Sequence, residues 1–437
     1  MSDNYLDHRG FPRIVITGMG AFTPIGNTLE QCWASLMHGR SGIDVITQFD
    51  AAGPDLPCQI AGEVKDFDPT DYLPRKEVRR MARASQLAVA AAREALNDAG
   101  FKGTVPNPER SATVLGTGLG GYEFSLNSYD TYREKGFARV LPYSLISSLP
   151  NLPCHHVSVE AQTLGPISTV VTACASGTQA IGEAAELIRH GRADLVLAGG
   201  VEAVITEVAL VGFAAMRGLP TEFNDNPQAA CKPFDKNRSG FVYSEGAGVL
   251  VLERLDQALE RGATIYAELV GHASSSDAFH IAALDPDGAG AVRAMQWAID
   301  DAGIERQQID YINAHGTGTA LNDVTETTAI KTLFEEHAYE LVVSSTKSLT
   351  GHAMGGAGAL EAIFSALALV HQKAPGTYNY ETPDPECDLD YAPNAPREMA
   401  LAYVLSNSFG LGGQNACLVL KRYDEPEHGR GPFTTQP

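Results

Sequence analysis

Two kinds of pattern are missing from the 437-residue chain, and each absence excludes a class of protein. A membrane-spanning helix needs about 20 consecutive apolar residues, and no apolar run in this sequence is nearly that long. The opening stretch MSDNYLDHRGFPR has neither the apolar segment nor the small-residue cleavage site of a secretory signal. We therefore expect a cytoplasmic protein that does not enter a membrane.

Paired cysteines are also missing. The seven cysteines are scattered, odd in number and without a C-x-x-C pair, which argues against a disulfide framework and against a zinc site built from paired cysteines. We expect all of them to be reduced. They stand at Cys32, Cys58, Cys154, Cys174, Cys231, Cys387 and Cys417.

Positive charge is scarce: 32 Lys and Arg face 53 Asp and Glu, which gives a net charge of −21. Such a chain repels nucleic acid and anionic membranes unless its cations are locally concentrated. One stretch, LPRKEVRRMARASQ, concentrates them. The spacing of Lys76, Arg79, Arg80 and Arg83 predicts four cations on one helical face, which is either a solvated face or a docking patch for an acidic partner.

The overall order of segments predicts an α/β protein, because apolar strand-like runs alternate with alanine-rich helical stretches. Four segments have a counterpart further along the chain in the same order; RIVITGMG matches YAELVGHA, and TVLGTG matches INAHGTG. We therefore predict two α/β halves, 1–258 and 259–423, with insertions in the first. The polar tail 424–437 is expected to be disordered.

The segment VTACASGTQAIGEAAELIRHG places Cys174 between a predicted buried strand and a predicted helix. At a helix N-terminus, unpaired N–H groups and the helix dipole favour a thiolate over a thiol. The small residues Ala173, Ala175, Ser176 and Gly177 leave room for a substrate carbonyl to reach the sulfur. From this setting alone, a catalytic nucleophile and a buried structural cysteine remain about equally supported.

Two histidines of the second half stand in matching glycine-rich turns. His315 follows the apolar run DYIN, and His352 follows LVVSS by a short loop. Because loops at the carboxyl ends of strands form the ligand crevice of open α/β sheets, both imidazoles can converge on Cys174. This combination favours nucleophilic catalysis, with imidazoles that stabilise negative charge or move protons.

Four blocks of the sequence carry a family resemblance. They are TACASG, NAHGTGT, KSLTGHAMGGAGALE and SNSFGLGGQNA, in this order. Together they resemble the hallmark motifs of β-ketoacyl-acyl-carrier-protein synthases of the elongating Cys-His-His type. The resemblance covers residues 13 to 422 and is strongest to the synthase II members of the family.

The resemblance implies a thiolase-like fold, with five alternating α-β-α-β-α layers built from two similar halves, and a homodimer. It implies that Cys174 accepts the acyl chain and that His315 and His352 assist the decarboxylation of a malonyl group on the carrier. Lys347 and Glu361 match the lysine and glutamate that support the two histidines. The reaction implied is the decarboxylative condensation of fatty-acid elongation, with no cofactor and no metal.

Further positions are assigned by the same resemblance. The backbone N–H groups of Cys174 and Phe409 would form an oxyanion hole, with Phe409 also gating the pocket. Leu119 would line the acyl pocket, and Thr317 and Thr319 would bind the pantetheine arm. The acidic acyl carrier protein would dock on Lys76, Arg79, Arg80 and Arg217.

The chain departs from the family pattern at three places. It has DAFHIA where members usually have DAYHMT, which puts Phe279 and Ala282 near the entrance, and GGQN instead of GGTN, which puts Gln414 beside the gating loop. The proline-rich SSLPNLP falls where members line the acyl pocket and the dimer interface. We therefore leave substrate shape, gate motion and chain-length preference open.

Other functions fit less well. GTGLGG matches a dinucleotide-binding pattern, but the residues after it lack the small apolar helix that such a site needs. Cys154, His155 and His156 suggest a metal site, but adjacent histidines in a strand would point to opposite faces. A degradative thiolase would use a second cysteine as acid and base, and a non-catalytic partner subunit would lack the nucleophile. A polyketide ketosynthase is the nearest alternative.

Overall fold

The computed structural model describes residues 3–53 and 55–424. Ten strands follow one another in the order β10-β9-β13-β14-β8-β1-β7-β6-β4-β5. The first half supplies β1 (Ile14–Phe22), β4 (Ser111–Gly116), β5 (Ile167–Val170), β6 (Leu195–Glu202) and β7 (Gly246–Arg254). The second half supplies β8 (Ala267–Ser276), β9 (Tyr311–Asn313), β10 (Val342–Ser344), β13 (Tyr403–Gly410) and β14 (Gln414–Lys421).

The two halves have the same strand topology. From the centre outward, the first half runs β1-β7-β6-β4-β5 and the second half runs β8-β14-β13-β9-β10. If the five strands that each half gives to this sheet are numbered in chain order, both halves have the spatial order 1-5-4-2-3. In both, the first two pairings are antiparallel and the last two parallel. The halves meet where Val15 and Ile16 of β1 pair with β8. This repeat supports the predicted boundary near residue 258, which we retain as a proposal.

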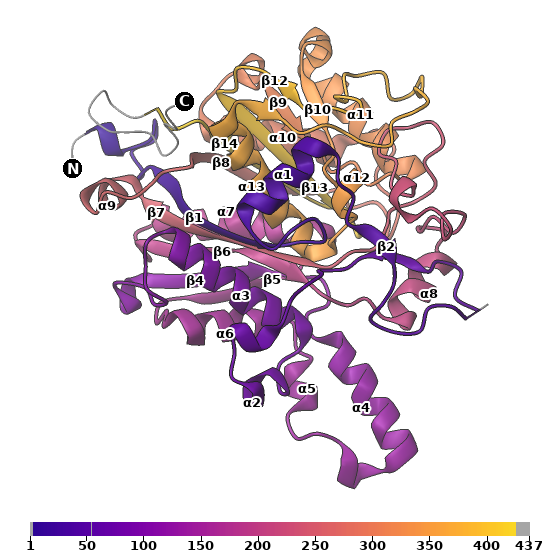
Figure 1. The fold of residues 1–437 in the computed structure, drawn as a ribbon. Coiled ribbons are helices and arrows are strands. Elements are labelled where there is room, and N and C mark those ends of the chain that lie inside the picture. Colours follow the sequence, from indigo (N-terminus) through magenta and orange to yellow (C-terminus); the bar gives the residue numbers. More distant parts are fainter. Residues whose placement is uncertain (1–2, 54, 425–437) are drawn as a thin grey trace.

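Alternating side chains divide the sheets into layers. Val249 and Val251 of β7 pack on α3 (Arg83–Asp98) and α6 (Leu152–Ala161), whereas Leu250 and Leu252 face α7 (Ser176–Arg189) and α13 (Ala357–His371). In the second half, the other outer layer is formed by α10 (Ala289–Ala302) and α11 (Ala320–Phe334). Figure 1 shows the first half, in indigo to magenta, below the second half, in orange and yellow. The predicted α/β class and its five alternating layers are confirmed.

The central helix α13 explains one deceptive stretch of sequence. Met354–His371 is long and apolar enough to cross a membrane by composition, yet 89% of it is buried inside the protein. It is apolar all round because α7 and strands of both halves surround it. Among the described residues no other helix passes this test.

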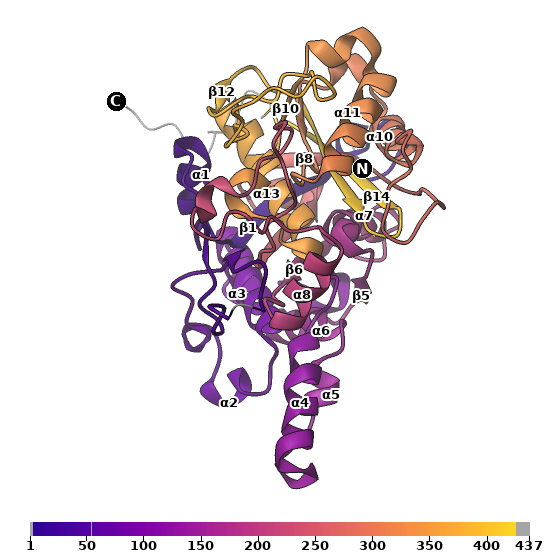
Figure 2. The same cartoon turned by 90° about the vertical axis from the view of Figure 1, so that its right-hand side faces the viewer.

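A helical arm extends from the first half. It comprises α4 (Tyr122–Lys135), which has no buried residue, and α5 (Ser144–Ser147). Figures 1 and 2 both show the arm projecting away from the layered body. Its exposed apolar side chains are Tyr122, Tyr129, Tyr132, Phe137, Leu141, Tyr143, Leu145 and Ile146.

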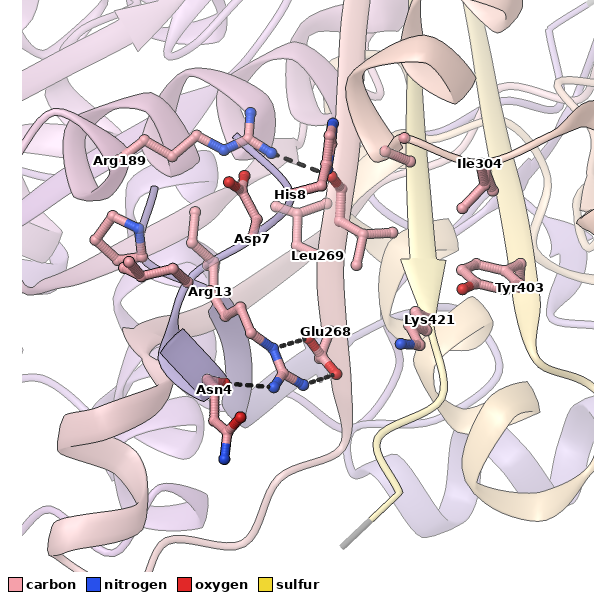
Figure 3. Close-up of a pocket in the computed structure, with 16 residues that line it drawn as sticks. Asn4, Asp7, His8, Arg13, Arg189, Glu268, Leu269, Ile304, Tyr403 and Lys421 are labelled. Atoms are coloured by element: carbon pink, nitrogen blue, oxygen red, sulfur yellow. Dashed lines mark hydrogen bonds and ion pairs between the residues drawn. The ribbon is translucent and has the colours of Figure 1, made fainter. Parts of the chain in front are cut away.

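The start of the chain is fastened to the second half by an ion pair (Figure 3). The guanidinium of Arg13 donates to both carboxylate oxygens of Glu268 on β8 and to the backbone carbonyl of Asn4. Nearby, Arg189 of α7 donates to the carbonyl of Val270 and to Asp301. These contacts line a cavity that contains none of the residues predicted to be catalytic.

The remaining elements are short or peripheral. They are α1 (Leu29–His38), β2 (Ile43–Val45), β3 (Ile60–Gly62), α2 (Arg75–Val78), α8 (Glu207–Ala215), α9 (Leu255–Glu260), α12 (Lys347–Thr350), β11 (Lys373–Ala374) and β12 (Arg397–Glu398). Asp424 is described, whereas the rest of the predicted disordered tail, 425–437, lies outside the described residues.

Two local predictions were wrong. The predicted continuous helical face of cations is interrupted, because α2 ends at Val78 and α3 begins only at Arg83. Arg83 points inward and donates to both oxygens of the buried Glu245. Cys154, His155 and His156 lie on helix α6, not in a strand.

Candidate active site

The carboxyl ends of parallel strands bring the predicted catalytic residues together. Cys174 lies in the short helical turn Ala173–Ala175, between β5 and α7. His315 follows β9, and His352 follows α12, which itself follows β10. The three side chains offer ligand or reaction atoms that all lie within 4.8 Å of one another. The structure therefore brings both imidazoles next to the Cys174 thiol, as the sequence predicts.

The turn before each central helix is strained. Ala173 has φ 51° just before Cys174, and Met354 has φ 44° just before α13. Side chains other than glycine rarely adopt this region, and the strain at such positions costs about 1–3 kcal/mol. The backbone of both turns is therefore held in place by the contacts that surround it.

The small residues after Cys174 have a packing role that sequence analysis did not foresee. A Cβ on Gly177 would come within 2.9 Å of the Ala359 backbone, and one on Gly358 would meet the Thr178 hydroxyl at 1.9 Å. Glycine at both positions allows the starts of α7 and α13 to touch. Gly177 therefore serves the packing of α7 on α13, while the Cys174 sulfur still faces an open cavity.

A cavity of about 430 Å³ opens onto the sulfur. Cys174 is 4% exposed and both histidines are 2% exposed. The two imidazoles lie edge to face, with ring centroids 5.3 Å apart. The cavity is lined mainly by apolar side chains, among them Ala282 and Phe409. Its polar lining includes Arg217, His280, Thr317 and Thr319.

Burial sets the protonation of this cluster. Desolvation, with the positive charge of Lys347 as a second cause, lowers the pKa of His315 and of His352 well below the usual range, so both rings are neutral at pH 7. Burial also raises the pKa of Cys174 to about 11, against a hydrogen bond from the Leu411 backbone and the charge of Lys347. The prediction that the helix N-terminus favours a thiolate is therefore wrong for the resting protein. The effect of burial on the pKa of Cys174 is larger than the effect of the helix dipole.

Lys347 and Glu361 form an ion pair beneath the histidines. The Lys347 ammonium donates to Glu361 Oε1, and both side chains are almost completely buried. Burial raises the pKa of Glu361 to about 7, and Lys347 opposes this increase. The pair places a fixed positive charge near both imidazoles and near the sulfur.

Two buried glutamates hold the loops next to His315 and His352, and sequence analysis missed both. Glu326 of α11 accepts the backbone N–H of His315 at 2.8 Å and that of Gly316 at 2.7 Å. Glu202, at the end of β6, accepts the N–H groups of Gly118, Leu119 and Gly355. The only signal in the sequence was an acidic residue at the end of an apolar strand or within a helix.

Other predicted residues are distributed around the cavity. Phe409 packs with its ring centroid 5.8 Å from that of His315. The hydroxyls of Thr317 and Thr319 are hydrogen-bonded to each other at 2.9 Å. Leu119 does not line this cavity; it is 36% exposed at the base of the arm. His280, which sequence analysis did not single out, also lines the cavity, and its Nδ1 accepts the backbone N–H groups of Ala282 and Ala283.

The basic cluster lies on its own cavity of about 460 Å³. Arg75, Lys76, Arg79 and Arg80 line it together with the apolar Phe124, Leu141, Pro142 and Tyr143 of the arm region. Arg217 is separate from this cluster and lines the cavity of Cys174.

Comparisons with known proteins agree with this geometry. The family model "Beta-ketoacyl synthase, N-terminal domain" matches residues 12–258, and "Beta-ketoacyl synthase, C-terminal domain" matches residues 266–381. The 3-oxoacyl-[acyl-carrier-protein] synthase 2 of Synechocystis is 47% identical over 94% of this chain and 98% of its own length. The protein of the same name from Staphylococcus aureus strain COL is 46% identical over 94% of this chain and 99% of its own.

Solved structures of ketosynthases share the fold. A beta-ketoacyl synthase from Burkholderia phymatum has a TM-score of 0.86 and 36% identity over 94% of this chain and all of its own. A type II polyketide ketosynthase, solved with its acyl-carrier protein, has a TM-score of 0.86 and 32% identity over 94% and 99%. With two family models that together span both halves and relatives close to half identical, the chain belongs to the beta-ketoacyl synthase family.

Proposed function

We propose that the protein condenses a Cys174-bound acyl chain with malonyl-acyl-carrier protein and releases carbon dioxide and 3-oxoacyl-acyl-carrier protein. One observation carries the proposal: a thiol and two neutral imidazoles meet at a single cavity, with imidazole nitrogens that have no hydrogen-bond partner. Such nitrogens are costly to bury unless a substrate engages them.

The first half-reaction is transfer of the acyl chain. The Cys174 thiol loses its proton to a neutral imidazole, and its sulfur attacks the thioester carbonyl of the incoming acyl carrier. The resulting oxyanion accepts hydrogen bonds from the backbone N–H groups of Cys174 and Phe409, and each such donor contributes about 3–4 kcal/mol. The carrier thiolate leaves and takes up the proton.

The second half-reaction uses the imidazoles as donors. When malonyl-carrier loses carbon dioxide, the electron pair of the broken C–C bond forms an enolate, whose oxygen needs N–H donors. His315 and His352 can donate because they are neutral and keep one N–H each. The enolate carbon then attacks the acyl carbonyl, and the Cys174 thiolate leaves and takes up a proton from solvent, which restores the resting thiol. The steps balance without a cofactor or a metal.

We assign the reaction to fatty-acid elongation. The named relatives with 46–47% identity are 3-oxoacyl-[acyl-carrier-protein] synthases of type 2, whereas the polyketide ketosynthase with its carrier is 32% identical. A polyketide role is the alternative, and Phe279, Ala282 and Gln414 keep the preferred acyl group open. A cytoplasmic location stays a prediction.

The assay that tests the function mixes the full chain with malonyl-carrier and with acyl-carriers of graded length. We expect an acyl adduct on Cys174, by mass spectrometry of the intact protein and its peptides, and products two carbons longer. Adducts on a different cysteine would contradict the site. Extension only of keto-substituted chains would favour the polyketide alternative.

The acyl carrier protein is proposed to dock on Lys76, Arg79 and Arg80, with Arg217 at the entrance to the active-site cavity. The cations contrast with a chain of net charge −21, and the apolar floor of their cavity suits a partner with apolar side chains between its carboxylates. The structure of a related ketosynthase with its carrier supports a carrier as the partner.

Reversing the charge of Arg79 and Arg80 to glutamate is expected to lower kcat/KM for the carrier substrate by on the order of 10-fold or more at low salt. The loss should shrink at high salt, because the screening length falls from about 10 Å at 0.1 M to about 3 Å at 1 M. Lys102→Glu, an exposed lysine outside the cluster, is the matched control. A defect of equal size at both salt concentrations would contradict electrostatic docking.

A second copy of this chain is proposed to cover the arm and β5. Strand β5 ends the ten-stranded order, so among the described strands its outer edge has no partner. Beside it stand the exposed apolar residues Val159, Leu164, Ile167 and Val171. A dimer across this face would pair the edge, cover the arm and bring the half-exposed Leu119 into an enclosed acyl pocket.

Ile167→Asp is therefore expected to shift the protein from dimer to monomer in sedimentation at micromolar concentration, because a charge on an edge strand opposes pairing. Leu259→Asp, a change of the same kind on α9, should leave the dimer intact. A monomeric parent protein, or an Ile167→Asp variant that still dimerises, would overturn this surface.

A further inference from the structure

The catalytic cluster also has the composition of a metal site. Within the described residues it is the one group of three or more His, Cys, Asp or Glu side chains whose ligand atoms lie this close together. His315 Nδ1 and both ring nitrogens of His352 are buried and have no hydrogen-bond partner. Neutral imidazole and thiolate are the ligands that zinc and cadmium prefer, as in the Cys and His sites of zinc proteins.

The spacing of the rings fits tetrahedral coordination. With Zn–N bonds of about 2.0–2.1 Å, two imidazoles on one tetrahedral ion would have ring centroids about 5.2 Å apart. The His315 and His352 centroids are 5.3 Å apart. With a Zn–S bond of about 2.3 Å, neighbouring ligand atoms on the ion would lie about 3.3–3.6 Å apart. The sulfur and the ring nitrogens now lie within 4.8 Å of one another, so the longest of these distances must shorten by about 1 Å. Rotation of side chains into the cavity can supply this movement, because the cavity contains unfilled space around the sulfur.

The local charges permit a divalent cation. The positive charge of Lys347 would oppose it, and the hydrogen-bonded carboxylate of Glu361 offsets part of that charge. Glu202 acts electrostatically on the same sulfur with the opposite sign to Lys347.

We propose that Cys174, His315 and His352 bind one zinc or cadmium ion, with solvent in the fourth position, and that the ion inhibits the enzyme. The thiol proton leaves to solvent as the S–metal bond forms, and both imidazoles bind as neutral ligands. The ion competes directly with the acyl group, because the same sulfur cannot hold both. It is an inhibitor, not a cofactor of the condensation.

The test titrates the full, untreated chain with cadmium chloride and, separately, zinc chloride in the absence of substrate. We expect one equivalent of cadmium to produce the ultraviolet thiolate-to-cadmium charge-transfer band. The same equivalent should slow alkylation of Cys174 by iodoacetamide, followed by peptide mass mapping, and a chelator should restore the rate. Protein already acylated on Cys174 should not develop the band.

Variants separate this site from adventitious binding. Cys174→Ser should lose the band, whereas Cys154→Ser should keep it; Cys154 donates to the Thr113 and Ser168 carbonyls, which a serine hydroxyl can also do. His315→Asn should weaken cadmium binding at least as much as loss of an outer-shell partner, about 10–100-fold. A band that survives in Cys174→Ser, or an alkylation rate unchanged by saturating cadmium, would overturn the proposal. Because no substrate is present, either result leaves the proposed condensation untouched.

Discussion

Replacing Cys174 by alanine is expected to abolish acyl loading and to lower condensation by on the order of 10⁴-fold or more, as loss of a covalent nucleophile does in other enzymes. The sulfur is the atom in the cluster that can form the thioester, since both imidazoles are needed as neutral donors. Intact-protein mass measures loading, and product mass measures condensation. Cys231→Ala is the matched control, because Cys231 is buried in the same apolar cluster but does not line the cavity.

His352→Ala tests the division of labour in the same assay. The variant should still load an acyl chain on Cys174 but lose condensation by about 10²–10⁴-fold, the usual contribution of a positioned proton donor or acceptor. His315 remains to take the thiol proton in the first half-reaction. Equal loss of both half-reactions would contradict separate roles, and full condensation without Cys174 would overturn the nucleophile assignment.

The largest effect on folding is expected at the buried ion pair. Lys347→Met removes the cation and leaves the Glu361 carboxylate buried without its partner, which costs about 3–5 kcal/mol in comparable cases. The free energy of unfolding, measured by denaturant titration, should fall by this amount. Burial already raises the pKa of Glu361 to about 7, and removal of Lys347 should raise it further, so the penalty should be largest above pH 7.

The double variant Lys347→Met with Glu361→Leu gives the comparison. With both charges gone, most of the stability should return, because a buried ion pair and an apolar pair of similar volume are often nearly equal in free energy. Condensation should stay impaired, since the field on both imidazoles is lost. A single variant as stable as the parent protein at pH 8 would contradict the importance of the pair for folding.

Several site predictions came directly from sequence because they depend on local order. The strand, turn and helix around Cys174, and the loops that carry His315 and His352, were predicted because apolar runs end at glycine-rich turns there. Parallel strands then bring their carboxyl ends to one edge, which is a property of the topology and not of any single residue. The repeated order of segments likewise indicated the two halves that the strand pairing displays.

Errors arose where a distant partner decides the outcome. Arg83 does not lie on the predicted cationic face, because its guanidinium pairs with Glu245. That carboxylate is far along the chain, is buried and needs a counter-charge. Glu202 and Glu326 hold the catalytic loops through backbone N–H groups that no periodic pattern encodes. Gly177 was interpreted only as room for substrate, whereas it also allows helix α13 to pack closely against α7.

The sequence by itself determined the α/β class and predicted the internal repeat and the convergence of Cys174 with two histidines, because these follow from periodicity, turn residues and short motifs. Only the tertiary structure decided the protonation of the site. A helix N-terminus favours a thiolate, but burial within two packed halves removes water from the sulfur and the rings, and this desolvation is the larger effect. Desolvation depends on every chain segment that surrounds a group, so it becomes defined only when the halves have packed together.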